Sequence, residues 1–122
     1  MKGNIESLAM EIYKWCIKRN LWGDNCIYYN NKAIASWPEW EGEKGKKIAE
    51  RLYEYQNKNP LTYFNYANPH GLSMSYEGSL YTVLNGNIKG WMKIEAEFMK
   101  LFERYGCYAT YGNAWNLTTY DL

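Results

Sequence analysis

The sequence predicts an α+β fold, with a mostly antiparallel sheet of about five to six strands and three helices packed on one face. Three observations predict it. At 122 residues, 47% of them hydrophobic and 22% charged, the chain has the size and balance of one globular domain spanning residues 1–122. Segments with helical spacing of apolar residues alternate with short segments rich in tyrosine. Neither an internal repeat nor a long linker divides the chain.

The first helix is expected over residues 5–19, where apolar side chains recur every three or four positions and charged side chains take the opposite face. Asn4 is a suitable N-cap residue, because its side-chain oxygen can accept a backbone N–H of the first turn. Asn20 and Gly23 end the helix.

A β-hairpin is expected next, with strands at 26–29 and 32–37. Its turn residues are Asn30 and Asn31, since asparagine tolerates the positive φ angles that a two-residue turn requires. Pro38 closes the second strand.

The middle of the chain is predicted as a charged loop over 39–46, a second helix over 46–57 and a strand over 62–67. The helix prediction rests on four apolar residues at helical spacing between positions 48 and 53. The strand prediction rests on the aromatic residues that the segment contains.

The long helix of the C-terminal half carries the clearest periodic signal in the chain. Gly106 is the expected residue after it, because helices often end in a left-handed glycine. The elements predicted here are a turn over 68–71, a half-buried strand over 72–76, a short helix over 79–84, the long helix over 89–105, and strands over 107–111 and 114–120.

The charge and cysteine content narrow the classes of function. Fourteen basic against thirteen acidic residues give a formal charge of +1, which argues against direct binding to duplex nucleic acid. Cys16, Cys26 and Cys107 are too few for a disulfide framework and are expected as reduced thiols. The sequence shows no signal-like or membrane-spanning apolar run, so we expect a cytoplasmic protein with no membrane partner.

Candidate catalytic groups are sparse. His70 is the only histidine, and it lies in an Asn-Pro-His-Gly turn, where an exposed polar residue is usual. The cysteines and His70 lack a metal-ligand spacing. Glu95 and Glu97 are two apart on a predicted helix and therefore point to different faces. We therefore expect no enzymatic activity, no cofactor and no metal.

A glycine-containing loop, Gly42 to Lys47, precedes the predicted second helix, a position where backbone N–H groups can bind phosphate. The spacing is not that of a P-loop, because two residues rather than four separate the glycines and Lys47 stands where a hydroxyl is needed. A solvated loop is the main interpretation. A looser anion contact through Lys44, Lys46 or Lys47 is the alternative.

Thirteen tyrosines, six tryptophans and three phenylalanines form an aromatic surplus. The long helix buries Trp91, Phe98, Phe102 and Tyr105 on one face, whereas other aromatics must lie on the sheet face away from the helices. There they suit a ligand pocket or a protein interface, and their number predicts a homo-oligomer. The candidate binding residues are Trp37, Trp40, Lys44, Lys46, Lys47, Tyr63, Tyr66 and Arg104.

Three segments of the C-terminal half, 66–69, 72–81 and 98–116, carry a family resemblance. The last contains the runs Phe102-Glu103-Arg104-Tyr105-Gly106 and Gly112-Asn113-Ala114-Trp115-Asn116-Leu117. They resemble small hypothetical proteins of Firmicute bacteria and their phages or prophages, which bring no activity with them. Because short proteins of this kind are often anti-defence factors, the resemblance implies a host defence protein or a signalling nucleotide as partner, in the cytoplasm of the host bacterial cell.

The function expected from the sequence is stoichiometric binding by a phage- or prophage-encoded protein. It would be an anti-CRISPR-like inhibitor of a host immune complex or a protein that sequesters a nucleotide immune signal. Nucleotide binding needs stacking rings and cations such as Arg19, Arg51 or Arg104, whereas protein inhibition needs an exposed aromatic and acidic patch such as residues 37–43. The alternatives are a small enzyme that uses His70 or a carboxylate, and a dimeric structural or interaction subunit.

Overall fold

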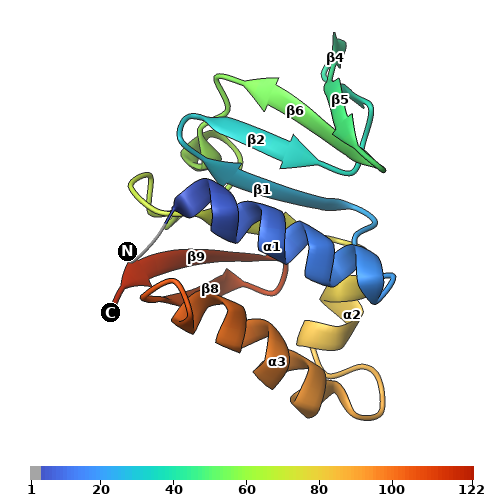
Figure 1. The fold of residues 1–122 in the computed structure, drawn as a ribbon, viewed down its shortest axis with the longest axis vertical. Helices are drawn as coiled ribbons and strands as arrows, with labels where there is room; N and C mark the ends of the chain where they lie inside the picture. Colours follow the sequence, from blue (N-terminus) through green and yellow to red (C-terminus); the bar gives the residue numbers. More distant parts are fainter. Residues whose placement is uncertain (1–3) are drawn as a thin grey trace.

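The computed structural model describes residues 4–122 and shows an antiparallel sheet with three helices packed against it (Figure 1). Seven strands form one sheet in the order β5-β6-β2-β1-β7-β9-β8, and β3 and β4 form a separate hairpin. The elements are α1 (Ile5–Lys18), β1 (Asn25–Tyr29), β2 (Lys32–Ala35), β3 (Glu39–Trp40), β4 (Glu43–Lys44), β5 (Lys46–Ala49), β6 (Leu52–Gln56), the 3-10 turn η1 (Pro60–Thr62), β7 (Ser73–Tyr76), α2 (Ser79–Leu84), α3 (Trp91–Glu103), β8 (Cys107–Asn113) and β9 (Asn116–Asp121). The predicted α+β class is confirmed.

The predictions of the first helix and of the long C-terminal helix are confirmed in place and nearly in length. α1 begins after Asn4, whose side-chain oxygen accepts the Glu6 backbone N–H at 2.7 Å, and it ends at Lys18. α3 is shorter at both ends than the predicted 89–105. Gly106 follows it with a φ angle of 74°, the left-handed conformation expected after a helix.

The main hydrophobic core lies between the three helices and one face of the sheet. Trp15 of α1 packs on Phe98 of α3 with ring centroids 5.2 Å apart, and Phe98 packs edge-on against Phe102. Trp91 and Tyr105 are only partly buried at its margin. The fully buried members include Leu8, Ile12, Trp22, Ile27, Ile34, Leu52, Leu72, Met74, Tyr76, Phe98 and Phe102.

Strand β7 joins two parts of the sheet. On one side of it lie β1, β2, β6 and β5, and on the other the hairpin of β9 and β8. Met74 of β7 is opposite Ile27 of β1 and also opposite Leu117 of β9. All four residues of β7 are buried, so the half-buried prediction is wrong, because Ser73 is covered too and shares a 2.7 Å hydrogen bond with the Thr118 hydroxyl.

The first predicted hairpin is confirmed as β1 and β2. Asn30 and Asn31 have φ angles of 50° and 59°, as a two-residue turn of this type requires. Strand β2 ends at Ala35, two positions before the predicted end.

The second predicted helix, 46–57, is wrong, because the segment forms the hairpin of β5 and β6. Its turn lies at Glu50 and Arg51, and Arg51 has a φ angle of 51°. The Tyr13 hydroxyl donates to the Glu50 carbonyl at 2.5 Å, and the Trp22 indole N–H donates to the Arg51 carbonyl at 2.6 Å. Contacts with distant residues therefore fix a turn that the local sequence does not signal.

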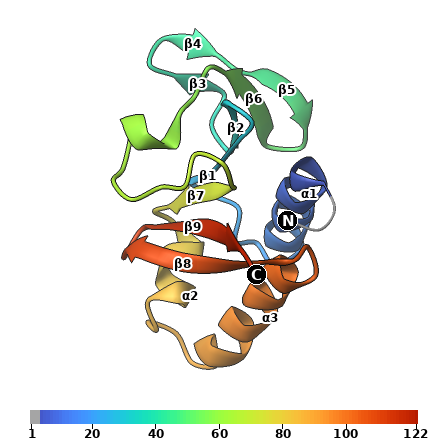
Figure 2. The same ribbon diagram turned by 90° about the vertical axis from the view of Figure 1, so that its left-hand side faces the viewer.

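Two further segments differ from the predictions. The charged loop over 39–46 contains the short β3–β4 hairpin, whose turn has Gly42 at a φ angle of 82°. The strand over 62–67 is absent, because Asn59 and Pro60 begin the 3-10 turn η1 and the chain then loops across the sheet. Figure 2 shows this green segment on the opposite side of the sheet from α1.

Candidate functional site

A second, smaller cluster of aromatic residues lies on the sheet face away from the helices. The sheet residues beneath it include Cys26, Ala33 and Ala35, which are small and leave room for rings above them. We call this cluster the aromatic layer; it consists of Tyr28, Trp37, Trp40, Tyr53, Tyr55, Tyr63, Phe64 and Trp115. The prediction that aromatics occupy the non-helix face is confirmed.

Trp40 lies at the centre of the aromatic layer. Its ring centroid lies 5.4 Å from that of Trp37, 5.2 Å from that of Tyr55, 5.1 Å from that of Tyr63 and 6.0 Å from that of Tyr28. Only 9% of Trp40 is exposed. The structure thus brings together three predicted binding residues, Trp37, Trp40 and Tyr63, but it buries Trp40 as a packing residue.

Lys58 is a member of this site that the sequence analysis missed. Its ammonium nitrogen lies 4.6 Å from the Trp40 ring centroid, 5.8 Å from the Tyr55 ring centroid and 3.2 Å from a Glu43 carboxylate oxygen. Lys58 is 8% exposed, so the rings and the carboxylate replace much of its water. Burial raises the pKa of Tyr63, and the neighbouring Lys58 charge opposes that rise. No local sequence pattern signals this lysine.

A groove of about 340 Å³ opens at the edge of the aromatic layer. Tyr66 lies at this groove, is 81% exposed and has a φ angle of 67°, which non-glycine residues rarely adopt. We call it the 60s groove; its lining consists of Leu61, Thr62, Tyr63, Phe64, Asn65, Tyr66, Gly112, Asn113 and Trp115.

The chain that forms the 60s groove is tied to the sheet. The Asn68 backbone N–H donates to the Thr118 hydroxyl and the Asn68 side-chain amide donates to the Thr119 carbonyl, both at 2.7 Å. A Cβ atom added at Gly71 would lie 2.7 Å from the Thr119 hydroxyl and 2.8 Å from its carbonyl oxygen, so only glycine fits there. These contacts hold the segment in place and indicate a largely preformed groove.

The charged candidates do not join the aromatic ones. Lys44, Lys46 and Lys47 are exposed on β4 and β5, and no helix begins after Lys47. A phosphate site at a helix N-terminus is therefore absent here, whereas the looser anion contact through these lysines stays a prediction. Arg104 lies at the end of α3, where it lines a different groove.

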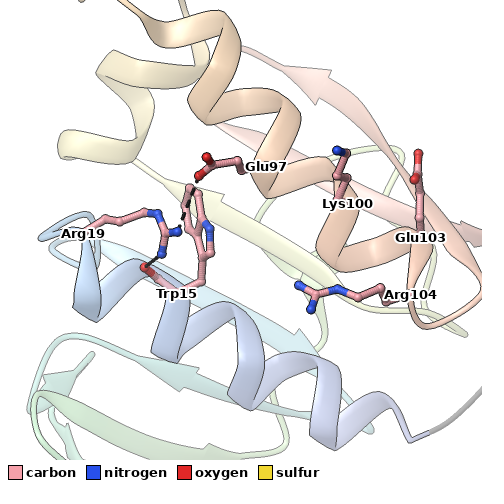
Figure 3. A pocket seen from close by; sticks show the side chains of 6 residues that line it. All are labelled: Trp15, Arg19, Glu97, Lys100, Glu103 and Arg104. Atoms are coloured by element: carbon pink, nitrogen blue, oxygen red, sulfur yellow. Dashed lines mark hydrogen bonds and ion pairs between the residues drawn. The ribbon is translucent and has the colours of Figure 1, made fainter.

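This second groove, of about 570 Å³, lies between α1 and α3 (Figure 3). The Arg19 guanidinium lies 4.4 Å from the Trp15 ring centroid and 3.5 Å from a Glu97 oxygen, while Arg104 lies farther along the groove. The i, i+4 spacing of Trp15 and Arg19 is a signal that could have found this contact. We call it the helix groove; its lining consists of Trp15, Arg19, Glu97, Lys100, Glu103 and Arg104.

The candidate catalytic groups named from the sequence do not gather at one site. His70 is exposed, as its turn context predicts. Glu95 accepts a hydrogen bond from Tyr111, whereas Glu97 pairs with Arg19, so these carboxylates do point to different partners. Residues 4–122 include no cluster of three or more histidine, cysteine, aspartate or glutamate side chains arranged to hold a metal ion.

All three cysteines are free thiols buried in the protein, as predicted. Burial raises the pKa of Cys16, Cys26 and Cys107 above the ordinary thiol value. Each therefore stays protonated near neutral pH, where a thiol is a poor nucleophile.

Comparison with protein-family models, with curated proteins and with solved structures found no match to this chain. Among residues 4–122, no helix has the length and apolar character needed to cross a membrane. The site must therefore be interpreted from its own geometry.

Proposed function

We propose that this chain is a non-enzymatic binding protein that acts stoichiometrically by holding a protein partner in the 60s groove. The observation that supports this best is Tyr66. An exposed ring on a left-handed, non-glycine backbone costs free energy, on the order of 1 kcal/mol, and gains no packing within the chain. Glu41 and Arg51 also have positive φ angles, but of these three only Tyr66 combines one with an aromatic side chain that is 81% exposed at a groove.

The chemistry of the 60s groove favours a protein over a nucleotide. Every residue that the structure places in its lining is uncharged, so the groove offers no cation for a phosphate. The aromatic rings and the amides of Asn65 and Asn113 suit an apolar side chain and the backbone of a partner segment. The proposed partner is a component of a host defence complex, in keeping with a phage or prophage origin for the chain.

Nucleotide sequestration is the second candidate, and the helix groove is the observation that favours it. Trp15 offers a ring, and Arg19 and Arg104 offer guanidinium groups for a phosphate. Glu97 and Glu103 line the same groove and would repel an anion. We therefore rank this function below protein binding.

The experiment compares Tyr66→Gly with Arg104→Ala, a matched variant in the other groove. Tagged protein is purified from a bacterial lysate and analysed by quantitative and native mass spectrometry. We expect one protein partner at an equimolar ratio, weakened more than about fivefold by Tyr66→Gly and unchanged by Arg104→Ala. Because glycine relieves the φ strain, Tyr66→Gly should leave stability unchanged or raise it by up to about 1 kcal/mol.

Three outcomes would overturn this proposal. A partner retained equally by wild type and Tyr66→Gly would move the contact elsewhere on the surface. A co-purifying nucleotide lost in Arg104→Ala would replace protein binding with sequestration. A substrate turned over by a route that needs His70 or a carboxylate would favour the small-enzyme alternative.

The predicted homo-oligomer, including the alternative of a dimeric interaction subunit, remains a proposal, but the number of aromatic residues no longer supports it. The sequence argument assumed that one chain cannot hide its aromatics. Tyr28, Trp40, Tyr55 and Phe64 are nevertheless buried within the chain, so the aromatic surplus does not itself require a second copy.

A further inference from the structure

The two outer strands of the sheet differ in how they are protected against pairing. β5 is four residues long, carries Lys46 and Lys47, and has an irregular register between Lys47 and Ala49. These features discourage another strand from adding to it. β8 also has an irregular register, between Tyr111 and Asn113, but it is seven residues long and no residue from Cys107 to Asn113 is charged.

The hydrogen bonds of β9 show which backbone groups of β8 point outward. The Leu122 N–H donates to the Gly106 carbonyl, and the Thr119 N–H donates away from β8 to the Leu72 carbonyl. In an antiparallel ladder such pairs alternate. The N–H and C=O groups of Cys107, Ala109 and Tyr111 therefore face away from β9, and among residues 4–122 no strand lies beyond β8. Cys107 is fully buried, so only the groups of Ala109 and Tyr111 are open for pairing.

The side chains of β8 that lie on the sheet face away from the helices are uncharged. Cys107 and Ala109 pack into the main core, so Tyr108 and Thr110 lie on the opposite face. Tyr108 is exposed, and its ring pairs with that of Tyr120 at a centroid distance of 5.9 Å.

The helix face beside β8 is partly apolar. The hydrogen bond between Tyr111 and Glu95 fixes which side of α3 faces this edge. Met92 and Met99 lie three positions before and four positions after Glu95, so they share that side of the helix. Met92 is 68% exposed. Methionine is well suited to such contacts because its side chain adapts to the shape of a partner.

We propose that β8 pairs antiparallel with β8 of a second copy of this chain, so that one sheet continues through both copies. With Ala109 on the two-fold axis, the N–H and C=O of Ala109 pair with those of Ala109 of the partner subunit, and the buried Cys107 lies opposite Tyr111 of the partner subunit. This proposal does not rest on the protein partner proposed for the 60s groove.

The charge pattern selects a second copy as the occupant. Across a two-fold axis, each residue near the centre meets itself or a close neighbour in the other chain, so a charged strand would oppose like charges. β8 has no charge to oppose, and the small side chain of Ala109 lies at the centre. β5 would bring Lys46 and Lys47 against their own copies.

The test measures molar mass by light scattering with chromatography and by sedimentation, from about 1 to about 100 µM. We expect wild type to reach twice the 14.4 kDa of one chain. The double variant Tyr108→Lys, Thr110→Lys puts lysine opposite lysine across the axis and should raise the dimer Kd by about tenfold or more. Ile48→Lys, on the exposed side of β5, is the matched control and should leave the mass unchanged.

Amide hydrogen exchange tests the register without any variant. In the wild-type dimer, the amide of Ala109 should become protected as concentration rises, whereas that of the buried Cys107 should be protected at every concentration. The amides of Tyr108 and Thr110 face β9 and should be protected at every concentration.

A mass of one chain over the whole range would overturn the proposal, as would a double variant that dimerises as well as wild type. A dimer lost in Ile48→Lys would place the interface at β5. Tyr66→Gly should leave the mass unchanged, so failure of the 60s-groove proposal is distinguishable from failure of this one.

Discussion

On the helix side of the sheet, aliphatic residues such as Ile27, Ile34 and Met74 face three helices, and regular elements close the core. On the other side, small residues such as Cys26 and Ala35 face rings that come largely from loops and a two-residue-per-strand hairpin. The helix side can be packed by periodic patterns of apolar residues. The aromatic layer depends on individual rings, together with a buried lysine, placed by an irregular chain.

This difference has a consequence for stability and for function. A helix that covers a core satisfies its own backbone N–H and C=O groups through internal hydrogen bonds. A loop that covers a core must instead be held in place by separate contacts with the rest of the protein. The hydrogen bonds of Asn68 and the close packing at Gly71 hold the segment over the aromatic layer in this way. We therefore expect the helix side to carry most of the stability and the aromatic-layer side to carry binding.

The largest expected effect is on the helix side. Phe98 is fully buried between Trp15 and Phe102, so Phe98→Ala should lower the free energy of unfolding by about 3–5 kcal/mol, measured in urea. Trp40→Ala on the other face should lower it by about 3 kcal/mol, because the loops around Trp40 can partly collapse into the cavity that the lost ring leaves. A larger loss for Trp40 than for Phe98 would reverse the comparison.

Removing the buried cation of the aromatic layer should have the next largest effect. Lys58→Met keeps the aliphatic stem but removes the ammonium from the Trp40 ring and from Glu43, and we expect a loss of about 2 kcal/mol. Lys46→Met, at an exposed position on β5, is the control and should change stability by less than about 0.5 kcal/mol in the same urea measurement. Equal effects of both variants would mean that the ring contacts add nothing.

Alkaline pH should destabilise the aromatic layer through its tyrosines. Burial raises the pKa of Tyr28 above the ordinary value of 10.0, so the folded protein keeps a proton that the unfolded chain releases. The stabilising contribution is therefore complete below about pH 10 and declines as pH rises above it, by about 1.4 kcal/mol per pH unit for one such group.

Tyr28→Phe should flatten this decline, measured by urea unfolding between about pH 9 and about pH 11. Tyr66→Phe, which alters an exposed ring, should leave the slope as in wild type. An unchanged slope in Tyr28→Phe would show that Tyr28 ionises in the folded protein.

The smallest expected effect is at the lone histidine. His70 is exposed, and its backbone N–H donates to Asn68 at 3.1 Å, so an alanine can keep that hydrogen bond. His70→Ala should leave stability and partner binding within about threefold of wild type, or roughly 0.7 kcal/mol, by unfolding and by titration calorimetry. Loss of function in this variant, with Tyr66→Gly silent, would favour the small-enzyme alternative.

The sequence predicted well those parts whose structure is decided locally. α1, α3, the Asn30-Asn31 turn and the glycine after α3 all follow from periodicity or backbone preference. The segment 46–57 could not be predicted in this way, because its apolar spacing fits a helix. It forms a hairpin because it pairs with β2 and because Tyr13 and Trp22 donate hydrogen bonds to the carbonyl groups of its turn.

The candidate site was predicted in part for the same reason. Alternation of side chains along strands shows that some aromatics must lie on the far face, and Trp37, Trp40 and Tyr63 do meet there. Lys58 comes from a loop, and Trp115 precedes β9, so their contacts depend on the tertiary fold. Arg104 was grouped with them by its charge alone, although α3 carries it to the other side of the molecule.

The position of β7 also bears on how the chain folds. β1 with β2, β5 with β6, and β8 with β9 are each joined by short turns, so these hairpins can form within microseconds of one another from local contacts. Pairing of β7 brings Ser73 opposite Tyr28 on one side and Thr118 on the other, so two long loops must close. The chain loses the entropy of closing these loops before the contacts that they allow can stabilise it. We therefore expect docking of β7 to be the slow, cooperative step, after which both halves of the sheet become protected together.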